Sequence, residues 1–431
     1  MAHSATAAPR DLLRRVYDAA VAAAHPRVCL PPFLPPLPAT GRLLVLGAGK
    51  AAAAMAVATE QHFRALGHLD RVSGFVTTRH GFALPTTVIE IIEAGHPVPD
   101  ANSIEGARRA LEAAHAAGPE DLVLVLMSGG ASALWAAPVN GVGFEAKQAL
   151  TKALLRSGAR IGEMNTVRRH LSRIKGGKLA AAAHPARLLT LAISDVPGDD
   201  PATIGSGPTV ADPTSLAEAR AVLERYAITP SAEIAAALDD PVNETLKPGA
   251  PALAAARYEL VAAPKASLAA AARIAAEAGY AIEVLGDAME GEARTVGAEH
   301  AAMALAAKAA GRRLAILSGG ELTVTVQGRG AGGPNQEYAL ALAIALAGAP
   351  GISALAADTD GIDGGSGEAS DPAGAVVVPD TLGRAKTLGL DPALMLADNN
   401  SSGFFGPLGD LVRCGPTQTN VNDLRVILID P

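Results

Sequence analysis

Short apolar runs alternate with stretches of helical character along the chain. Four of these runs are rich in strand-forming residues, are followed directly by Gly or Ser, and precede a helical stretch; they span residues 43–46, 122–127, 188–193 and 314–317. Such alternation is typical of parallel sheets joined by crossover helices. Because the runs are apolar on both faces, we expect helices on both sides of each sheet. The pattern predicts an α/β fold with mainly parallel sheets flanked by helices, and ligands at the carboxyl ends of the strands.

The length of the chain and one irregular segment predict two domains. A chain of 431 residues exceeds what one hydrophobic core normally supports. Around residues 240–256 the hydrophobic periodicity is lost and Pro and Gly are concentrated, which is typical of a domain boundary. We therefore expect an N-terminal α/β domain over residues 1–248 and a C-terminal α/β domain over residues 249–431.

Composition and charge exclude several classes of protein. The net charge of −7 provides no positive footprint for nucleic acid or for an anionic membrane. The two cysteines, Cys29 and Cys414, exclude a disulfide framework and favour a cytoplasmic location. Charges interrupt the N-terminal segment, so it predicts an amphipathic helix rather than a signal peptide, and no membrane span is expected. The expected partner is a small molecule, and a homodimer is compatible with the sequence.

The first strand leads into a glycine-rich turn and an alanine-rich helix. The spacing of Gly47, Gly49 and Ala52 matches the dinucleotide fingerprint, in which backbone N–H groups approach a phosphate at a helix N-terminus. This spacing predicts a Rossmann-like N-terminal domain. The strand predicted next is not followed by the acidic residue that would bind an NAD ribose, which leaves NADP open. Lys50 lies at the helix start, where a cation can contact an anion; the alternative is a surface lysine.

The loop Ser128-Gly129-Gly130-Ala131-Ser132 is the strongest single candidate for binding an anion. Its backbone can curl around a phosphate or carboxylate, and the hydroxyls of Ser128 and Ser132 can add donors. The alternative is an ordinary strand-to-helix turn in which a serine caps the helix. A second strand followed by Ser-Gly-Gly occurs at residues 312–324, so two such turns, one in each domain, would suit a cleft; the alternative is a common strand-exit turn.

A segment dense in basic residues spans 164–179 in this acidic chain. Helical spacing places Arg168, Ser172 and Lys175 roughly on one face, which suits a carboxylate or a phosphate. Charge runs of this kind are usually solvated helix faces, and Arg169 and Arg173 fit that alternative.

Carboxylates follow the strand at 188–193. Asp195 comes directly after the strand, where a carboxylate can hold Mg²⁺ or accept a proton from a substrate hydroxyl. Asp199 and Asp200 lie in a glycine-rich stretch, so ordinary turns also explain them. In the second half, the spacing of Asp358, Asp360 and Asp363 superficially resembles a calcium loop, but the distal Glu is missing. Two interpretations of these aspartates remain: they contact a magnesium nucleotide, or they stabilise the loop itself.

Eight motifs in fixed order resemble the glycerate 2-kinase family. They are GAGK at 47–50, EAGHPVPD at 93–100, SGGASAL at 128–134, NTVRRHLSRIKGGK at 165–178, ISDVPGDD at 193–200, GGPNQE at 332–337, DTDGIDG at 358–364 and GPTQTNVNDL at 415–424. The resemblance covers nearly the whole chain, and its C-terminal part resembles the MOFRL domain. It implies a two-domain α/β kinase with its active site in the interdomain cleft. The reaction it implies converts D-glycerate and ATP to 2-phosphoglycerate and ADP with a divalent metal, here Mg²⁺.

The resemblance also implies roles for individual residues. Lys50 matches the catalytic lysine of the family. Where the family typically has an arginine, this chain has Pro334, and Arg329 on the same glycine-rich loop is the hypothetical substitute. Together with the motifs above, the candidate site comprises catalytic Lys50, Asp195 and Arg329; substrate-binding Ser128, Gly129, Gly130, Ala131, Ser132, Arg168 and Lys175; nucleotide-binding Gly47, Gly49, Ser318, Gly319, Gly320, Asn335, Gln336, Glu337 and Asp360; and metal-binding Asp195 and Asp358.

Two rival functions stay open at this point. Members of the family have often carried the label hydroxypyruvate reductase, and an NAD(P)H-dependent reductase would use the Gly47 fingerprint. The absent acidic ribose contact counts against it. A non-catalytic regulator that binds a sugar phosphate could also use paired Ser-Gly-Gly turns, but it would leave the clustered aspartates unexplained.

Overall fold

The computed structural model describes residues 3–365 and 367–431, with side chains of the first helix described from residue 8 onward. Contacts divide the chain into two compact units. The first, which we call the N-unit, is Cys29–Val261. The second, the C-unit, joins the N-terminal segment that ends at Val28 to Ala262–Pro431. None of the described helices is both long and apolar enough to cross a membrane.

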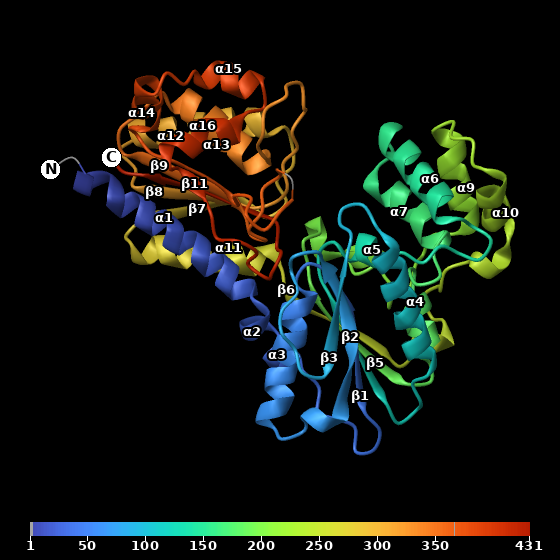
Figure 1. The fold of residues 1–431 in the computed structure, drawn as a ribbon. Coiled ribbons are helices and arrows are strands. Elements are labelled where there is room, and N and C mark those ends of the chain that lie inside the picture. The colour runs from blue at the N-terminus through green and yellow to red at the C-terminus, as the bar shows by residue number, and fades with distance from the viewer. Residues whose placement is uncertain (1–2, 366) are drawn as a thin grey trace. The chain divides into compact units, whose positions relative to one another are not determined.

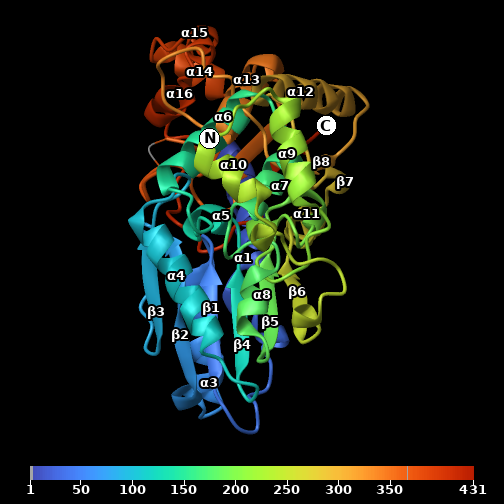
Figure 2. The same ribbon diagram turned by 90° about the vertical axis from the view of Figure 1, so that its right-hand side faces the viewer.

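A six-stranded sheet organises the N-unit. Its order is β3-β2-β1-β4-β5-β6, which is the doubly wound order of a Rossmann-like fold and confirms that prediction (Figure 2). Neighbouring strands from β3 to β5 run parallel. All residues of β1 and β4 are buried, as the apolar runs predict. The strands are β1 (Leu43–Ala48), β2 (Val72–Arg79), β3 (Ile89–Ala94), β4 (Leu122–Met127), β5 (Arg187–Ile193) and β6 (Ala256–Ala262).

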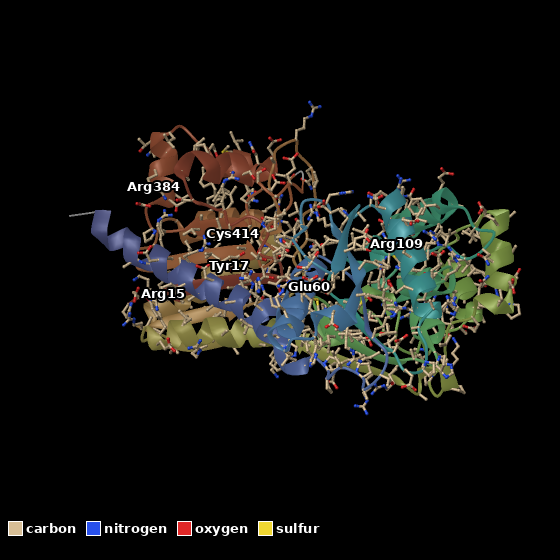
Figure 3. The ribbon with its side chains drawn as sticks, turned by 60° about the horizontal axis from the view of Figure 1, so that its bottom comes forward. Arg15, Tyr17, Glu60, Arg109, Arg384 and Cys414 are labelled. Atoms are coloured by element: carbon tan, nitrogen blue, oxygen red, sulfur yellow. The ribbon has the colours of Figure 1, made fainter. Side chains whose placement is uncertain are left out.

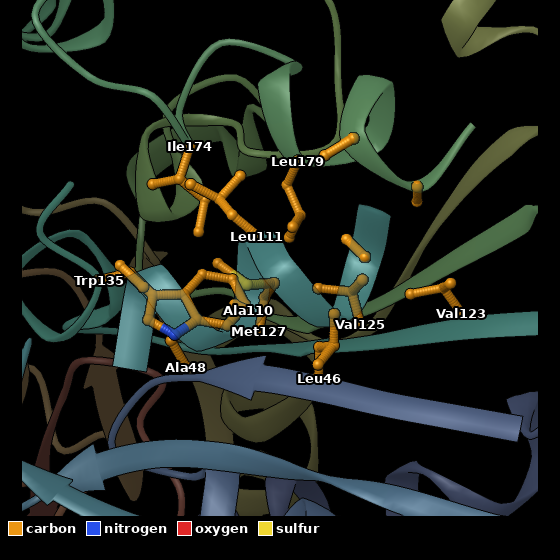
Figure 4. Close-up of a cluster of buried hydrophobic side chains, with 14 of the residues drawn as sticks. Leu46, Ala48, Ala110, Leu111, Val123, Val125, Met127, Trp135, Ile174 and Leu179 are labelled. Atoms are coloured by element: carbon orange, nitrogen blue, oxygen red, sulfur yellow. The ribbon is translucent and has the colours of Figure 1, made fainter. Parts of the chain in front are cut away.

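Helices cover both faces of this sheet. On one face, α4 and α8 pack against alternate residues of β1 and β4, with Trp135 buried between them (Figure 4). Helix α3 lies on the opposite face (Figure 1). A capping box between Asp100 and Ser103 begins α4. The helices are α2 (Pro26–Cys29, at the passage between the units), α3 (Ala52–Ala65), α4 (Ala101–His115), α5 (Ala131–Leu134), α6 (Phe144–Arg156), α7 (Ile161–His170), α8 (Lys178–Ala183), α9 (Leu216–Arg225) and α10 (Ala232–Asp239).

Four of these helices form a layer of their own. Helices α6, α7, α9 and α10 share an apolar core separate from that of the sheet, centred on Leu154, Val167 and Leu223. Short 3₁₀ turns connect the elements of the N-unit: η1 (Pro31–Phe33), η2 (Leu69–Arg71), η3 (Pro197–Asp199), η4 (Ile204–Ser206), η5 (Pro241–Asn243) and η6 (Pro251–Leu253). Since α7 leads into the basic segment, this layer positions the candidate cations.

The sheet of the C-unit is mixed, which differs from the predicted mainly parallel sheet. Its order is β11-β10-β9-β12-β8-β7. Strand β7 runs parallel to β8, but β12 is antiparallel to both β8 and β9, and β10 is antiparallel to β9 and β11. The strand direction changes because β12 returns from the C-terminal end of the chain and inserts between two earlier strands. The strands are β7 (Ala281–Gly286), β8 (Leu314–Ser318), β9 (Ile352–Asp358), β10 (Gly374–Val377), β11 (Leu411–Val412) and β12 (Asp423–Ile429).

The N-terminal helix packs in the C-unit, against the expectation that residues 1–248 form one domain. Helix α1 and α11 cover one face of the sheet, and α1 buries Leu13, Val16 and Tyr17 there. The Tyr17 hydroxyl donates to the Asp358 backbone oxygen at 2.8 Å, and Tyr17 lies beside Cys414 (Figure 3). Helices α12 and α13 cover the other face. The helices are α1 (His3–Ala24), α11 (Pro264–Glu277), α12 (Ala293–Ala309), α13 (Pro334–Leu346), α14 (Thr381–Thr387), α15 (Pro392–Ala397) and α16 (Ser401–Leu408).

The compact units therefore differ from the predicted domain limits in two places. The predicted limit between residues 248 and 249 lies inside the N-unit, because β6 completes the first sheet. The N-terminal helix belongs to the other unit because its apolar face packs on α11 and the second sheet. The interdomain cleft that we expect to hold the active site stays a prediction.

Candidate active site

The sheet order of the N-unit reverses between β1 and β4, and ligands of doubly wound folds bind beyond the carboxyl ends of such strands. The structure brings two separately predicted motifs together at this point. The Lys50 N–H donates to the Gly129 oxygen at 2.8 Å. The Ala51 N–H donates to Ser128 Oγ at 3.0 Å. Lys50 itself is half-buried. The turn after β1 and the loop after β4 thus form one connected structure.

These bonds also test the dinucleotide fingerprint. In that motif, the N–H groups at the turn bind a pyrophosphate. Here the Gly49 N–H donates to the Thr77 oxygen at 3.1 Å. The N–H groups of Lys50 and Ala51 donate to the loop after β4, at Gly129 and Ser128. The N–H groups of this turn are therefore already hydrogen-bonded within the protein, which weakens the prediction that Gly47 and Gly49 bind a cofactor.

Ser128 holds the two turns together. Its side chain is fully buried, and its oxygen accepts the bond from Ala51. Gly130 starts the short helix α5 with a φ of 84°, a left-handed conformation that favours glycine. The alternative predicted for this loop was a serine that caps the helix following it. Ser128 does accept a backbone N–H at the start of a helix, but that helix is α3 and not α5.

Ser132 connects the loop to the basic segment. Lys175 Nζ donates to Ser132 Oγ at 2.5 Å and to the Ser132 backbone oxygen at 2.7 Å. Ser132 Oγ also bonds Ser206 Oγ at 2.7 Å. Lys175 is buried, and this burial, together with the charges of Lys147 and Arg168, holds the pKa of its ammonium well below the usual range. An anion that binds beside such a lysine stabilises its ammonium form.

Arg168 projects from α7 and is half-buried. Burial lowers the pKa of its guanidinium. Within the part of the chain that the structure describes, no hydrogen bond or ion pair engages this guanidinium. The charge of Arg168 is among the causes that lower the pKa of Lys175, which is what links the two cations.

The two remaining arginines of this segment differ. Arg173 is exposed, as the solvated-face alternative predicts. For Arg169 that alternative is wrong, because Arg169 is buried and forms an ion pair with Asp212 at 3.2 Å. Sequence could not separate them, since Asp212 lies far along the chain.

Asp195 follows β5 and Ser194, and it is half-buried. The exposed Asp200 accepts from the Thr203 hydroxyl at 2.7 Å and from the Ala202 N–H at 3.1 Å, so it stabilises a turn. Among residues 3–365 and 367–431, no group of three or more His, Cys, Asp or Glu side chains suits a metal ion. Metal binding by Asp195 and Asp358 stays a prediction.

In the C-unit, the predicted nucleotide-binding residues Asn335 and Gln336 lie at the start of α13. Their N–H groups donate to the Asp363 carboxylate, each at 2.9 Å. Asn335 Nδ2 also donates to Asp423 Oδ1 at 2.6 Å. Burial raises the pKa of Asp363 to about 7, with a further contribution from Asp423. These contacts make Asp363 a cap for α13.

Glu337 is likewise engaged within the C-unit. It is buried, pairs with Arg294 at 2.6 Å and accepts from Asn399 Nδ2 at 2.9 Å. Asn399, which is not among the predicted site residues, thus supports the start of α13.

The second Ser-Gly-Gly turn differs from the first. Arg425 is buried, and its guanidinium donates to Ser318 Oγ at 3.1 Å and to the backbone oxygens of Gly319 and Gly320. The Gly319 N–H donates to the Gly286 oxygen at 2.8 Å. The alternative of a strand-exit turn describes this site better than an anion cradle.

The remaining candidates lie on loops of the C-unit. Asp358 Oδ1 accepts from the Asp360 N–H, and Asp360 Oδ1 accepts from the Ile362 N–H, each at 2.8 Å. These bonds favour loop architecture for the two aspartates. The side chain of Arg329 is exposed, while its N–H donates to Asp398 Oδ1 at 3.0 Å.

Two residues at the site escaped the sequence analysis. A Cβ atom on Gly130 would lie 3.0 Å from the His96 ring and 3.5 Å from the Lys50 stem, so His96 packs directly on the anion loop. The motif EAGHPVPD, which contains His96, was the sequence signal that could have identified this residue. Lys147 on α6 donates to the Leu171 oxygen at 2.7 Å, and its charge is among the causes that lower the pKa of Lys175. Nothing in its local sequence distinguishes it from a surface lysine.

Comparisons with known proteins identify relatives of this chain. A family described as a domain of unknown function (DUF4147) matches residues 12–239, and the MOFRL family matches residues 314–423. A Thermotoga maritima protein named D-glycerate 2-kinase is 39% identical over 393 residues, which cover 90% of this chain and 91% of the relative. An Agrobacterium vitis protein with the provisional name hydroxypyruvate reductase is 51% identical over 426 residues, covering 97% and 94% respectively.

One solved structure extends the likeness to three dimensions. A crystal structure of glycerate kinase from Thermotoga maritima matches with a TM-score of 0.86 at 37% identity, over 98% of this chain and 99% of that chain. The likeness spans both units.

Proposed function

This chain belongs to the glycerate 2-kinase family and is a kinase, and we propose that it transfers the γ-phosphoryl group of ATP to the 2-hydroxyl of D-glycerate. The observation that carries the proposal is the junction of Lys50 with the Gly129–Gly130 loop at the point of sheet reversal, where Lys175 bonds Ser132 of the same loop. That junction gathers cations and a glycine loop where a small anion can bind.

Phosphoryl transfer asks a protein for alignment and for neutralisation of charge on the transferred group. In our proposal, Lys50 neutralises the transferring phosphoryl group and the Gly130 loop holds its oxygens. Arg168 and Lys175 hold the carboxylate of D-glycerate. Asp195 either holds the metal ion or accepts the proton of the 2-hydroxyl as the O–P bond forms and the bond to ADP breaks.

Mg²⁺ is the divalent metal that we propose for ATP. It usually takes one or two protein carboxylates in addition to phosphates and water, so a single carboxylate such as Asp195 fits its donor preference. When bound, the metal supplies positive charge to the phosphates. For the nucleotide, the loops of the C-unit around Arg329 and Asp360 remain our candidates, with Arg329 the exposed cation among them.

A coupled assay tests the function. ATP and D-glycerate are supplied, and enolase without a phosphoglycerate mutase removes the product. We expect a signal, because only phosphorylation at the 2-position makes a substrate for enolase. A signal that needs mutase would show transfer to the 3-position, and no signal with either would contradict the proposal.

Replacing Lys50 tests its role in that reaction. Lys50→Ala removes the cation assigned to the transferring phosphoryl group, and we expect kcat to fall by about 100-fold or more. Thermal melting of the variant checks that the fold survives. Near-normal turnover would remove Lys50 from the mechanism.

A reductase is the second candidate, because a relative at 51% identity carries that name. Reduction of hydroxypyruvate would require NADPH at the Gly47 turn, whose amides already bond Thr77, Ser128 and Gly129. We therefore expect no oxidation of NADPH or NADH by the purified protein with hydroxypyruvate. Cofactor oxidation at a rate comparable to glycerate phosphorylation would favour the reductase.

A further inference from the structure

His96 follows the edge strand β3 but lies against the loop that follows β4. Two strands separate β3 from β4 in the sheet order β3-β2-β1-β4. All four strands run parallel, so the loops at their carboxyl ends leave the same edge of the sheet. A Cβ atom on Gly130 would lie 3.0 Å from both Cδ2 and Nε2 of the His96 ring. His96 therefore reaches across two strands to the candidate anion loop, residues 128–132.

Lys50 approaches the same point of that loop. The same Cβ atom would lie 3.5 Å from Lys50 Cγ, and the Lys50 N–H donates to the Gly129 oxygen at 2.8 Å. Gly130 has a φ of 84°, a left-handed conformation that glycine adopts without strain. The imidazole edge and the lysine stem leave little room for a side chain at this position. Three motifs distant in sequence, GAGK, EAGHPVPD and SGGASAL, thus meet at Gly130.

The loop itself provides two donors for a ligand. Among the residues that the structure describes, no protein acceptor binds the backbone N–H groups of Gly129 and Gly130. Consecutive N–H groups in a turn that contains a left-handed residue form a concave site for an anion. The Cδ2–Nε2 edge of the His96 ring lies beside Gly130, and Nδ1 is buried on the other side of the ring. Nε2 is therefore the ring nitrogen placed to add a third donor.

The segment that carries His96 is held by Asp100. The Asp100 carboxylate caps α4 by accepting the Ser103 N–H at 3.0 Å, and its other oxygen bonds His80 Nε2 at 2.8 Å. A Cβ atom on Gly95 would lie 3.2 Å from Asp100 Cγ, so the chain before His96 packs directly on this carboxyl group. A donor that is held in place needs no rearrangement when charge develops beside it.

We infer that His96 is a further catalytic residue, whose Nε2–H donates a hydrogen bond to the phosphoryl group as it transfers beside Lys50 and the Gly130 loop. The inference deepens the proposed function and rests on it for the identity of the reaction. No covalent bond joins His96 to phosphorus, and the proton stays on Nε2 throughout. The contact is strongest while charge spreads over the phosphoryl oxygens, so it acts on kcat rather than on the affinity for D-glycerate.

Two replacements distinguish a donor from a packing group. His96→Phe fills the place of the ring without an N–H, and we expect kcat for D-glycerate phosphorylation to fall by about 100-fold. His96→Gln keeps an N–H that can reach the position of Nε2, so its loss of kcat should stay within about tenfold. The KM values for D-glycerate and ATP should change little in both variants. Equal losses of kcat would show that the ring only packs on Gly130, which overturns the inference.

His184→Phe is the matched control. His184 also precedes a proline of the N-unit, but it is exposed, so this variant should keep both kcat and KM. Imidazole added in solution should raise the activity of His96→Ala by about tenfold or more, because it returns the missing N–H. It should not raise the activity of Lys50→Ala. Equal restoration of both variants would contradict the assignment to His96.

A binding measurement on the unaltered chain makes the test independent of turnover and of any variant that fails to fold. With isotope-labelled histidine, nitrogen NMR follows the ring of His96, whose signals are identified by their absence from the spectrum of His96→Gln. 2-Phosphoglycerate should shift these signals, and D-glycerate, which lacks the phosphoryl group, should shift them much less. No shift with 2-phosphoglycerate would overturn the inference, whatever the activity.

The outcomes also separate the inference from the function. Phosphorylation of D-glycerate with kcat unchanged in His96→Phe would overturn the inference and leave the function standing. A His96 signal shifted by 2-phosphoglycerate in a protein that phosphorylates no D-glycerate would contradict the function. It would leave the contact of His96 with a phosphoryl group standing.

Discussion

Gly49 decides how closely the two turns of the candidate site approach each other. Its φ of 142° is open to glycine and rarely to other residues, and a Cβ atom there would lie 2.0 Å from Ser128 Oγ. The residue before Lys50 is therefore constrained both by its backbone and by Ser128. The position of Lys50 depends on that constraint.

Gly49→Ala should accordingly destabilise the fold and reduce activity together. We expect a loss of about 2–6 kcal/mol from backbone strain and overpacking. Gly67→Ala is the matched control, because Gly67 has a φ of 74° but nothing within 4 Å of a Cβ atom. It should cost only about 1–2 kcal/mol and leave turnover intact. Urea denaturation compares the two, and equal losses would show that contact with Ser128 does not matter.

At the scale of elements, the start of α13 is organised by one buried acid. The Asp363 carboxylate accepts the N–H groups of Asn335 and Gln336, which are orphan donors at any helix start. Its pKa of about 7 means that the Asp363 carboxyl is protonated in a substantial fraction of molecules at neutral pH. The motif GGPNQE is thus explained at least partly by helix capping.

The pH dependence of stability should report this acid. Because the folded-state pKa of Asp363 is raised above the ordinary value near 4, folding binds a proton between about pH 4 and 7. Stability is therefore lost as pH rises through that range, by an amount on the order of a few kcal/mol. Asp363→Asn should flatten the slope relative to the unaltered protein, measured as urea midpoints from pH 5 to pH 8. An identical slope in the variant would contradict the assignment.

Sequence predicted elements well where the signal was local. The apolar runs became buried strands, and the glycine turn after β1 indicated the Rossmann-like order of the first sheet. The expectation of a mainly parallel sheet does not hold in the C-unit, where β12 is antiparallel to both of its neighbours, because the direction of a strand depends on the distant strands that it joins. The two Ser-Gly-Gly turns looked alike for the same reason, since Arg425 reaches one of them from more than a hundred residues away.

Candidate residues divided along the same line. Lys50, Ser132 and Lys175 were predicted from their own motifs, and the structure places all three in the N-unit, with Lys175 bonded to Ser132. Lys147 carried no local signal, because its significance comes only from the cations that surround it. Charge environment is a property of the packed chain.

At the scale of the whole molecule, the C-unit is built from two distant stretches of chain. Helix α1 buries Leu13, Val16 and Tyr17 against α11 and the second sheet, although the whole N-unit lies between them in sequence. The first helix is therefore part of the core of the C-unit.

Shortening one of its side chains should weaken the C-unit. Leu13 is fully buried, so Leu13→Ala should cost about 2–5 kcal/mol. Leu388→Ala, at a leucine of the same unit that is 54% exposed, should cost little. Hydrogen exchange at amides of β12 follows the unit directly, and equal protection in both variants would show that α1 is dispensable.

The split origin of the C-unit also sets an order of assembly on the ribosome. Helix α1 is synthesised before the N-unit, but α11 and the strands that cover its apolar side are synthesised after residue 261. At about 5–20 residues per second, α1 waits on the order of ten seconds or more for its partners. The N-unit can fold in that interval, whereas the apolar stripe of α1 stays available to chaperones or to neighbouring chains until α11 and the strands of the second sheet have been synthesised.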